Sequence, residues 1–175
     1  YCKQSVANDL WTIDKNISSI EFEVPVLFAK NVTGKFNTFD GFVSLDLSNQ
    51  SNNKALINVG IDSLELNYKR YKDLVLSKVF FDAKKFPIGL IDTNNFKFNY
   101  EDNKINLIGE LTIKGKSQNI PIDIEVIKLA NELVQVKSEI FFSRNEFNIG
   151  IGSWKNTSIL KDEIKRKLNI FLFKE

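Results

Sequence analysis

The stretch YKDLVLSKVFFDAKKFP, residues Tyr71 to Pro87, is the one segment of this chain with convincing helical spacing. Asp73 lies in its first turn, and Leu74 and Val75 belong to an apolar stripe that recurs at i, i+3 and i+4. Pro87 ends the segment, because proline cannot continue a helix. We expect a helix over about residues 71–83 that acts as a lid on whatever the strands enclose. A surface helix that merely completes an ordinary core has the same spacing.

The rest of the chain alternates apolar and polar residues with the period of a β-strand. A strand over residues 20–28 contains Pro25, which indicates a sheet edge or a bulge. A long curved strand over 32–47 has Gly34 and Gly41 where it would bend, and the strand over 55–66 changes phase at residues 62–63. Further strands are expected over residues 96–100, 105–113, 120–126, 134–142 and 164–173, the first two joined as a hairpin by the turn 101–104.

About eight strands in meander order result, which makes the fold class all-β. Such strands close either as two stacked sheets or as a barrel. Long bent strands, glycines at the bends and a single helix favour an eight-stranded antiparallel barrel, whose interior is filled by side chains or holds one small ligand. We expect a single domain over residues 1–175, with residues 1–9 as a loose extension.

Composition excludes several classes of protein. The formal net charge of 175 residues is +2, with acids and bases well mixed, which argues against a nucleic-acid surface. No apolar run approaches the roughly 20 residues needed to span a bilayer. Fifteen Phe against two Trp give the aromatic residues a purely apolar character. Such a core either holds an apolar ligand or is packed solid.

Catalytic motifs are mostly missing. The chain has no histidine and one cysteine, which excludes the usual nucleophilic triads and the usual zinc sites. Without histidine or methionine, the usual axial ligands of heme are also missing. Acidic residues lie singly along polar strand faces, as solvated charges do. We therefore expect no catalytic residues, no metal and no cofactor.

The lone cysteine, Cys2, and the absence of methionine bear on processing. Cys2 is either a free thiol or the site of lipid attachment, although a lipid-modified cysteine would normally begin the mature chain. A chain without an initiator methionine has been processed or trimmed, and removal of an export signal is one explanation.

Several short motifs follow one another in a fixed order and spacing. They are Trp11-Thr12-Ile13-Asp14, Gly34-Lys35-Phe36, Phe80-Phe81-Asp82, Gly109-Glu110-Leu111-Thr112-Ile113-Lys114-Gly115 and Arg144-Asn145-Glu146-Phe147-Asn148. Together they resemble the YceI-like family of polyisoprenoid-binding, lipocalin-like proteins, over roughly Leu10 to the C-terminus. The resemblance implies an extended eight-stranded barrel with a helix at its mouth and a tunnel for a long apolar chain. It also implies a periplasmic or secreted bacterial protein whose export signal has been removed.

The chain departs from the family pattern at two places. Val75 stands where the family usually has a histidine, within Arg70-Tyr71-Lys72-Asp73-Leu74-Val75-Leu76. Asn148 follows Phe147 where the family usually has glycine. Any contact that the histidine makes with a polar head group is lost here, which puts the identity of the ligand in doubt.

Taken together, these observations predict non-catalytic binding or transport of a long-chain apolar lipid: a polyisoprenoid, an isoprenoid quinone, or a fatty acid or amide. The alternative is an envelope stress-related interaction protein with a dry barrel and a protein partner, and a homodimer is left open. Arg70, Lys72 and Arg144 are candidates to bind an anionic head group. The alternative for each is an ordinary solvated charge on the surface. The candidate walls, each also readable as plain core, are Phe22, Val24, Phe28, Phe36, Leu74, Phe80, Phe81, Phe98 and Phe142.

Overall fold

The computed structural model describes residues 8–46 and 48–175, a chain built almost entirely from antiparallel strands. Alternating apolar residues bury one face of each long strand, as period-two patterning requires. The strands are β1 (Asp9–Ile13), β2 (Ser19–Val24), β3 (Val32–Phe36), β4 (Phe39–Leu45), β5 (Lys54–Gly60), β6 (Leu64–Leu66), β7 (Ile88–Asn94), β8 (Lys104–Ile113), β9 (Lys116–Ala130), β10 (Leu133–Ser143) and β11 (Glu163–Lys174), and the α-helix is α1 (Lys72–Leu76).

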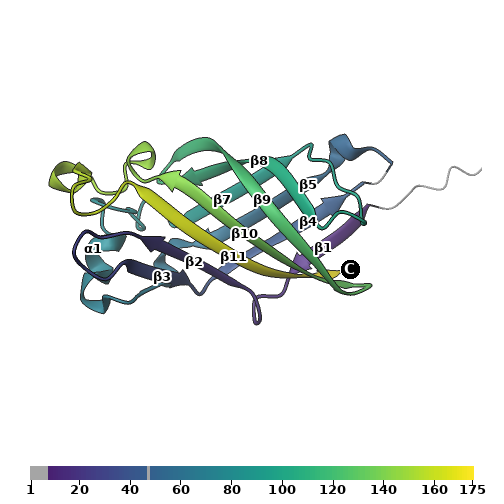
Figure 1. Ribbon diagram of the computed structural model, residues 1–175, viewed down its shortest axis with the longest axis horizontal. Helices are drawn as coiled ribbons and strands as arrows, with labels where there is room; N and C mark the ends of the chain where they lie inside the picture. Colours follow the sequence, from purple (N-terminus) through teal and green to yellow (C-terminus); the bar gives the residue numbers. More distant parts are fainter. Residues whose placement is uncertain (1–7, 47) are drawn as a thin grey trace, which may run out of the picture.

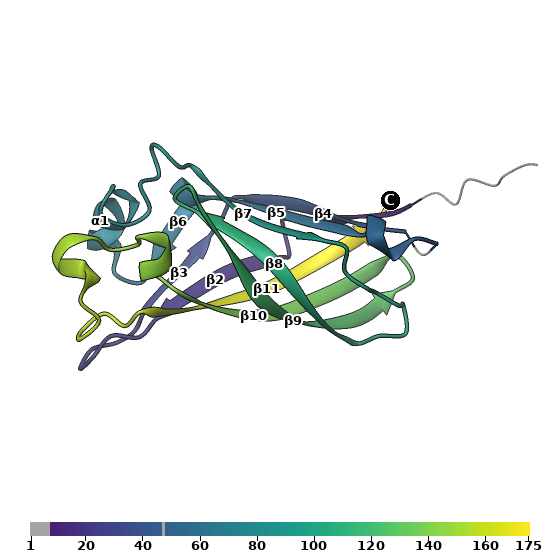
Figure 2. The same ribbon diagram turned by 90° about the horizontal axis from the view of Figure 1, so that it is seen from above.

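Eight of these strands close into a barrel. The hydrogen-bonded order β1-β4-β5-β7-β8-β9-β10-β11 returns to β1 through its pairing with β11. The long strand β11 pairs with β2 through its first half, and β2, β3 and β6 extend the wall toward the end that carries α1. Figures 1 and 2 show an elongated barrel with α1 at one end and the chain's C-terminus near the other. The all-β barrel expected from the sequence is confirmed.

Two expected irregularities lie close to where the sequence placed them, but the first is not at the glycines: Gly34 lies within β3 and Gly41 within β4, and the break falls at residues 37–38. The run over residues 32–47 divides into β3 and β4, and β4 ends at Leu45, two residues short of the expectation, with residue 47 outside the described part. The phase change at residues 62–63 is a 3₁₀ turn, Ile61–Ser63, between β5 and β6. Each break lets the strand change direction and follow the barrel wall.

The helix is much shorter than the expected span of 71–83. A 3₁₀ turn over Lys69–Tyr71 leads into α1, which ends at Leu76. Ser77 stops it, because its backbone is extended and its hydroxyl donates to the Leu74 carbonyl at 2.7 Å. The following turn buries both Phe80 and Phe81. Consecutive helical residues point in different directions, so a helix would not bury both side chains in one core.

The segment after Pro87 was also assigned wrongly. β7, residues 88–94, was missed, and the hairpin expected over 96–113 is absent because residues 95–103 form a loop. Asn95 has φ +58°, which ends the extended conformation. The alternation of Phe96, Phe98 and Tyr100 is therefore not a strand pattern. These rings line the interior at the end of the barrel away from α1.

The N-terminal expectation needs one correction. Asp9, placed by the sequence in a loose extension, begins β1 and pairs with Leu45. The expectations for residues 1–7, including those for Cys2, lie outside the described residues. Within the described ranges, no helix combines the length and the apolar character that crossing a bilayer requires.

Candidate functional site

A cavity of about 350 Å³, here called the mouth cavity, lies at the end of the barrel that carries α1. β2 contributes Phe22 and Val24, because residues of equal parity on a strand face the same side. α1 contributes Leu74, and the turn that follows it contributes Phe80 and Phe81. The structure therefore brings five of the candidate walls together around one cavity, although the helix is short. Their contact with a ligand stays a prediction.

Aromatic packing fixes the floor and the side of the mouth cavity. Phe36 packs beneath the lining residues Phe22 and Phe81. Its ring centroid lies 5.7 Å from that of Phe22 and 6.4 Å from that of Phe81, and only the second pair is edge-to-face. Phe80 packs against Trp154 at 5.5 Å, which joins the turn after α1 to the loop that precedes β11. Such aromatic pairs hold their rings in defined orientations. These contacts join the lining of the cavity to the aromatic core beneath it.

Arg144 forms part of the cavity wall, although only 1% of it is exposed. Its guanidinium donates four hydrogen bonds to backbone carbonyls: Nε to Lys161 at 2.9 Å, Nη1 to Ile149 at 3.0 Å, and Nη2 to Leu160 at 2.9 Å and Asn156 at 3.2 Å. Burial lowers its pKa. The expectation of a cation free for a head group, or of a solvated one, is therefore wrong, because backbone acceptors already occupy Arg144.

The other two candidate cations differ in position. Arg70 is exposed, lines the mouth cavity and lies over the Tyr71 ring at 4.8 Å. Lys72 is half-buried in α1 and lies outside the lining of the cavity. Of the three candidates, only Arg70 thus presents an accessible charge at the mouth, beside the exposed Lys30 that the sequence did not single out. The contact of Arg70 with a head group stays a prediction.

Phe28 does not face the interior. Its side chain is 98% exposed, and its backbone has φ +59°. β2 ends at Val24, just before Pro25, and the chain then leaves the sheet in a turn. The parity that places Phe22 and Val24 inside no longer applies after this break, so the expectation of an inward Phe28 is wrong.

A second cavity of about 130 Å³, here called the distal cavity, lies toward the other end of the barrel. Phe98 lines it, together with Phe96 and Tyr100 from the loop 95–103. The remaining candidate walls, Phe36 and Phe142, are buried core residues that line neither cavity. An engineered cavity of about 150 Å³ holds a benzene molecule, so the distal cavity has room for a short apolar group.

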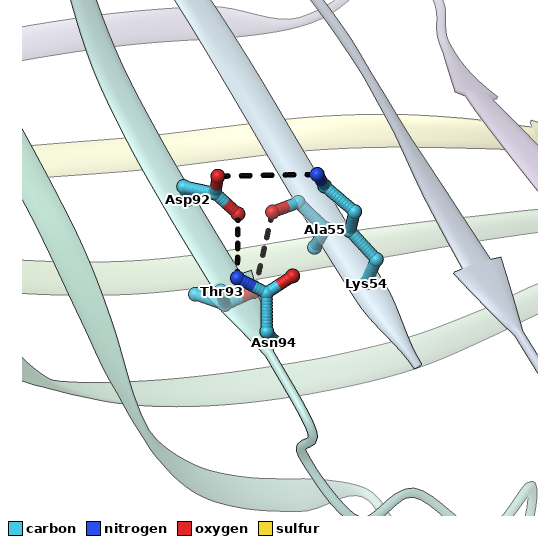
Figure 3. A network of polar contacts seen from close by, with 5 residues as sticks. All are labelled: Lys54, Ala55, Asp92, Thr93 and Asn94. Atoms are coloured by element: carbon cyan, nitrogen blue, oxygen red, sulfur yellow. Dashed lines mark hydrogen bonds and ion pairs between the residues drawn. The ribbon is translucent and has the colours of Figure 1, made fainter. Parts of the chain in front are cut away.

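The polar side chains of the distal cavity mostly bond to the backbone. The Thr93 hydroxyl donates to the Ala55 carbonyl at 3.3 Å (Figure 3), and the Ser138 hydroxyl donates to the Asp123 carbonyl at 2.7 Å. Asp92 and Lys54, drawn beside Thr93 in Figure 3, form an ion pair at 4.0 Å, and both side chains reach solvent. The wall that faces the cavity is therefore effectively apolar, while charge remains on the outer face.

Tyr100 lines the distal cavity, and its environment predicts how the stability of the protein changes at alkaline pH. Its hydroxyl donates to Asp9, and burial together with this bond raises its pKa to about 12, against about 10 in an unfolded chain. Because the folded pKa is the higher one, the stability that Tyr100 contributes is complete below about pH 10 and is lost as pH rises toward 12. In urea denaturation across this range, the wild type should lose more stability than Tyr100→Phe. Equal losses would show that the half-buried phenol and its bond to Asp9 do not contribute to stability.

No group of three or more His, Cys, Asp or Glu side chains within residues 8–46 and 48–175 is placed to hold a metal ion. The mouth cavity thus offers mainly apolar walls, the buried Arg144, and the exposed Lys30 and Arg70. The model of the YceI-like domain matches residues 11–172, nearly all of the barrel. The chain belongs to the YceI-like family.

Relatives of this YceI-like chain include a UPF0312 protein of Vibrio vulnificus (strain YJ016), 32% identical over 110 residues. That match covers 63% of the chain and 58% of the relative, which is less than two thirds of the relative's length. The crystal structure of Burkholderia cenocepacia BcnA has a TM-score of 0.81 and 28% identity over 91% of this chain and 98% of BcnA. A polyisoprenoid binding domain from Saccharophagus degradans, implicated in plant cell wall breakdown, has a TM-score of 0.76 over 94% and 98% of the two chains. At 12% identity it shares the fold alone.

The sequence reasoning missed one charged residue of this YceI-like barrel. Arg166 occupies an inward position of β11, between Ile164 and Leu168, and is 3% exposed. The sequence does indicate this position. Every second residue over 164–172 is Ile or Leu except Arg166. A charge on the apolar side of a strand is the departure that period-two analysis detects.

Proposed function

We propose that this protein binds a long-chain apolar lipid inside the barrel and performs no chemistry on it. Polyisoprenoids, isoprenoid quinones, and fatty acids or amides are the candidate classes. The observation that supports this proposal is the mouth cavity, whose volume of about 350 Å³ is enclosed mainly by apolar side chains. Sites for small molecules are typically about 300–1,000 Å³ and apolar, with few polar groups.

Burial supplies the driving force. Each methylene group that leaves water contributes about 0.8 kcal/mol, so a chain of several methylenes binds without a strong polar contact. The YceI-like fold and the polyisoprenoid binding of the Saccharophagus degradans relative point to the same class of ligand. A periplasmic or secreted location belongs to this proposal and rests on the family resemblance.

Exposed apolar side chains at the rim offer a route of entry. Leu27, Trp154 and Ile159 are 41%, 41% and 66% exposed, and the last two line the mouth cavity. The Leu27 amide bonds to the Ile159 carbonyl at 2.9 Å, so both residues belong to one rim. An apolar chain that passes this rim is partly shielded from water before it reaches the interior.

Native mass spectrometry of the purified protein, followed by organic extraction, tests the proposal directly. We expect an added mass of a few hundred daltons or more that leaves as a long-chain lipid. A clean protein mass that neither isoprenoids nor fatty acids alter would overturn lipid binding and direct the search to a protein partner.

Filling the mouth cavity should abolish binding. Val75 of α1 lines the cavity, whereas Asp73 of the same helix is exposed and lies outside the lining. Val75→Trp should lower the affinity for the uncharged fluorophore N-phenyl-1-naphthylamine at least about tenfold, since an indole occupies much of the available volume. Asp73→Trp places the same side chain on the outer face and should change the affinity less than twofold. Equal effects of the two variants would locate binding elsewhere.

A further inference from the structure

Arg166 lies inside the barrel between the two cavities. On β11, Ile164 lines the mouth cavity and Leu168 lines the distal cavity, and Arg166 has the same inward parity between them. Its cross-strand partners are Phe22 on β2 and Ile140 on β10, both buried. The guanidinium carbon lies 5.5 Å from the Phe36 ring and 5.9 Å from the Phe142 ring. The charge is thus held in an aromatic layer just below the floor of the mouth cavity.

This cation has no polar partner among the described residues. Its Nε is buried without a hydrogen bond, and no ion pair or hydrogen bond joins its guanidinium to another described side chain or carbonyl. Arg144 provides the contrast, because its guanidinium is equally buried and donates four hydrogen bonds. The two rings near Arg166 attract a cation but accept no conventional hydrogen bond.

A buried charge without a partner is strongly unfavourable, so proteins normally pair such a group. Burial lowers the pKa of Arg166 to about 10, which still leaves it a cation at neutral pH. The guanidinium presents parallel N–H donors that match the two oxygens of a carboxylate. A phosphate monoester carries a charge of about −1.5 to −2 at neutral pH and would leave excess negative charge in the apolar interior.

We propose that Arg166 binds the carboxylate of a long-chain acid whose apolar chain occupies the mouth cavity, so that the ligand enters with its head group inward. This assignment rests on the proposed function and narrows it to acidic lipids. Arg166 is not itself part of the cavity lining, so the ring of Phe22, which lines the cavity, and the ring of Phe36 beneath it must turn to admit the head group. Arg70 at the rim then has no required contact with the carboxylate.

Paired ligands of equal chain length test the assignment. Laurate and dodecanol differ in the head group alone, and each is titrated against bound N-phenyl-1-naphthylamine at neutral pH. Wild-type protein should bind laurate at least about tenfold more tightly than dodecanol, the size expected of charge-assisted hydrogen bonds. Arg166→Met should remove this preference while its affinity for the uncharged fluorophore stays within twofold of wild type.

Two further variants keep the test decisive if Arg166→Met folds poorly. Arg166→Lys retains the charge and should keep part of the preference for laurate. Arg70→Met removes the exposed guanidinium at the rim and should leave the preference intact. Without ligand, Arg166→Met should melt at the same temperature as wild type or higher, because it removes an unpaired buried charge.

Failure of this assignment is distinguishable from failure of the proposed function. A wild-type protein that binds the fluorophore but shows no preference for laurate overturns the role of Arg166 alone. Loss of the preference in Arg70→Met, with Arg166→Met unchanged, overturns it in favour of a head group at the rim. A protein that binds neither the fluorophore nor either lipid overturns both proposals.

Discussion

Replacing Arg144 by methionine is expected to lower the free energy of unfolding by about 4 kcal/mol or more. The variant removes the donor from four carbonyls, those of Ile149, Asn156, Leu160 and Lys161, in a site where the arginine itself is 1% exposed. Each buried carbonyl left without a donor costs about 1–3 kcal/mol, less where water reaches it. These carbonyls belong to the segment between β10 and β11, so the same change should loosen one side of the mouth cavity.

Urea denaturation of Arg144→Met and Arg144→Lys measures this effect. Lysine keeps the charge but cannot direct donors to four separate carbonyls, so it should recover only a small part of the loss. Arg70→Met is the matched control, because its guanidinium is exposed at the same cavity and should contribute less than about 1 kcal/mol. A stability of Arg144→Met close to wild type would show that the segment does not depend on this arginine.

Gly41→Ala is expected to destabilise the barrel by about 3 kcal/mol or more, at the upper end of overpacking effects. A Cβ atom at Gly41 would lie 2.2 Å from the Leu56 carbonyl oxygen and 3.1 Å from the Ile57 Cα atom. Both atoms belong to the backbone of β5, which is hydrogen-bonded to β4 on one side and to β7 on the other. The clash can therefore be relieved only by moving a strand of the closed sheet.

Gly89→Ala, in β7 on the other side of β5, is the comparison variant. Its nearest contact would be the Ile61 Cδ1 atom at 3.3 Å, at the end of a side chain that can shift. We expect this change to alter stability by less than about 1 kcal/mol. If both alanine variants show the same denaturation midpoint in urea, close approach of β4 and β5 is not what requires glycine at residue 41.

The barrel was predictable because burial of one strand face leaves a period-two signal in the sequence. β9, β10 and β11 were found in this way, and the break between β5 and β6 appears as the phase change at residues 62–63. The same signal misleads in the loop 95–103, where alternate aromatic residues fill the barrel end without forming a strand. Periodicity reports which side chains are buried, and it does not report whether the backbone between them is hydrogen-bonded.

The mouth cavity was only partly predictable for a related reason. Phe22 and Val24 follow from the parity of one uninterrupted strand, whereas Phe28 lies beyond Pro25, where parity no longer applies. Charge type alone could not separate Arg144 from Arg70, because the difference lies in carbonyls supplied by residues 149–161. Those partners are brought together by the fold, and no short sequence motif encodes them.

The pairing of β11 with both β1 and β2 has a consequence for how the molecule folds. The bond from the Phe171 amide to the Ser18 hydroxyl joins residues 153 positions apart, and β11 supplies the last wall of the ring. Contacts between residues so distant in sequence slow folding, because a long chain loses its freedom before those contacts stabilise it. During synthesis, β1 and β2 cannot pair with β11 until it emerges from the ribosome. Until then their unpaired edges can pair with other chains, which exposes them to aggregation and to chaperones.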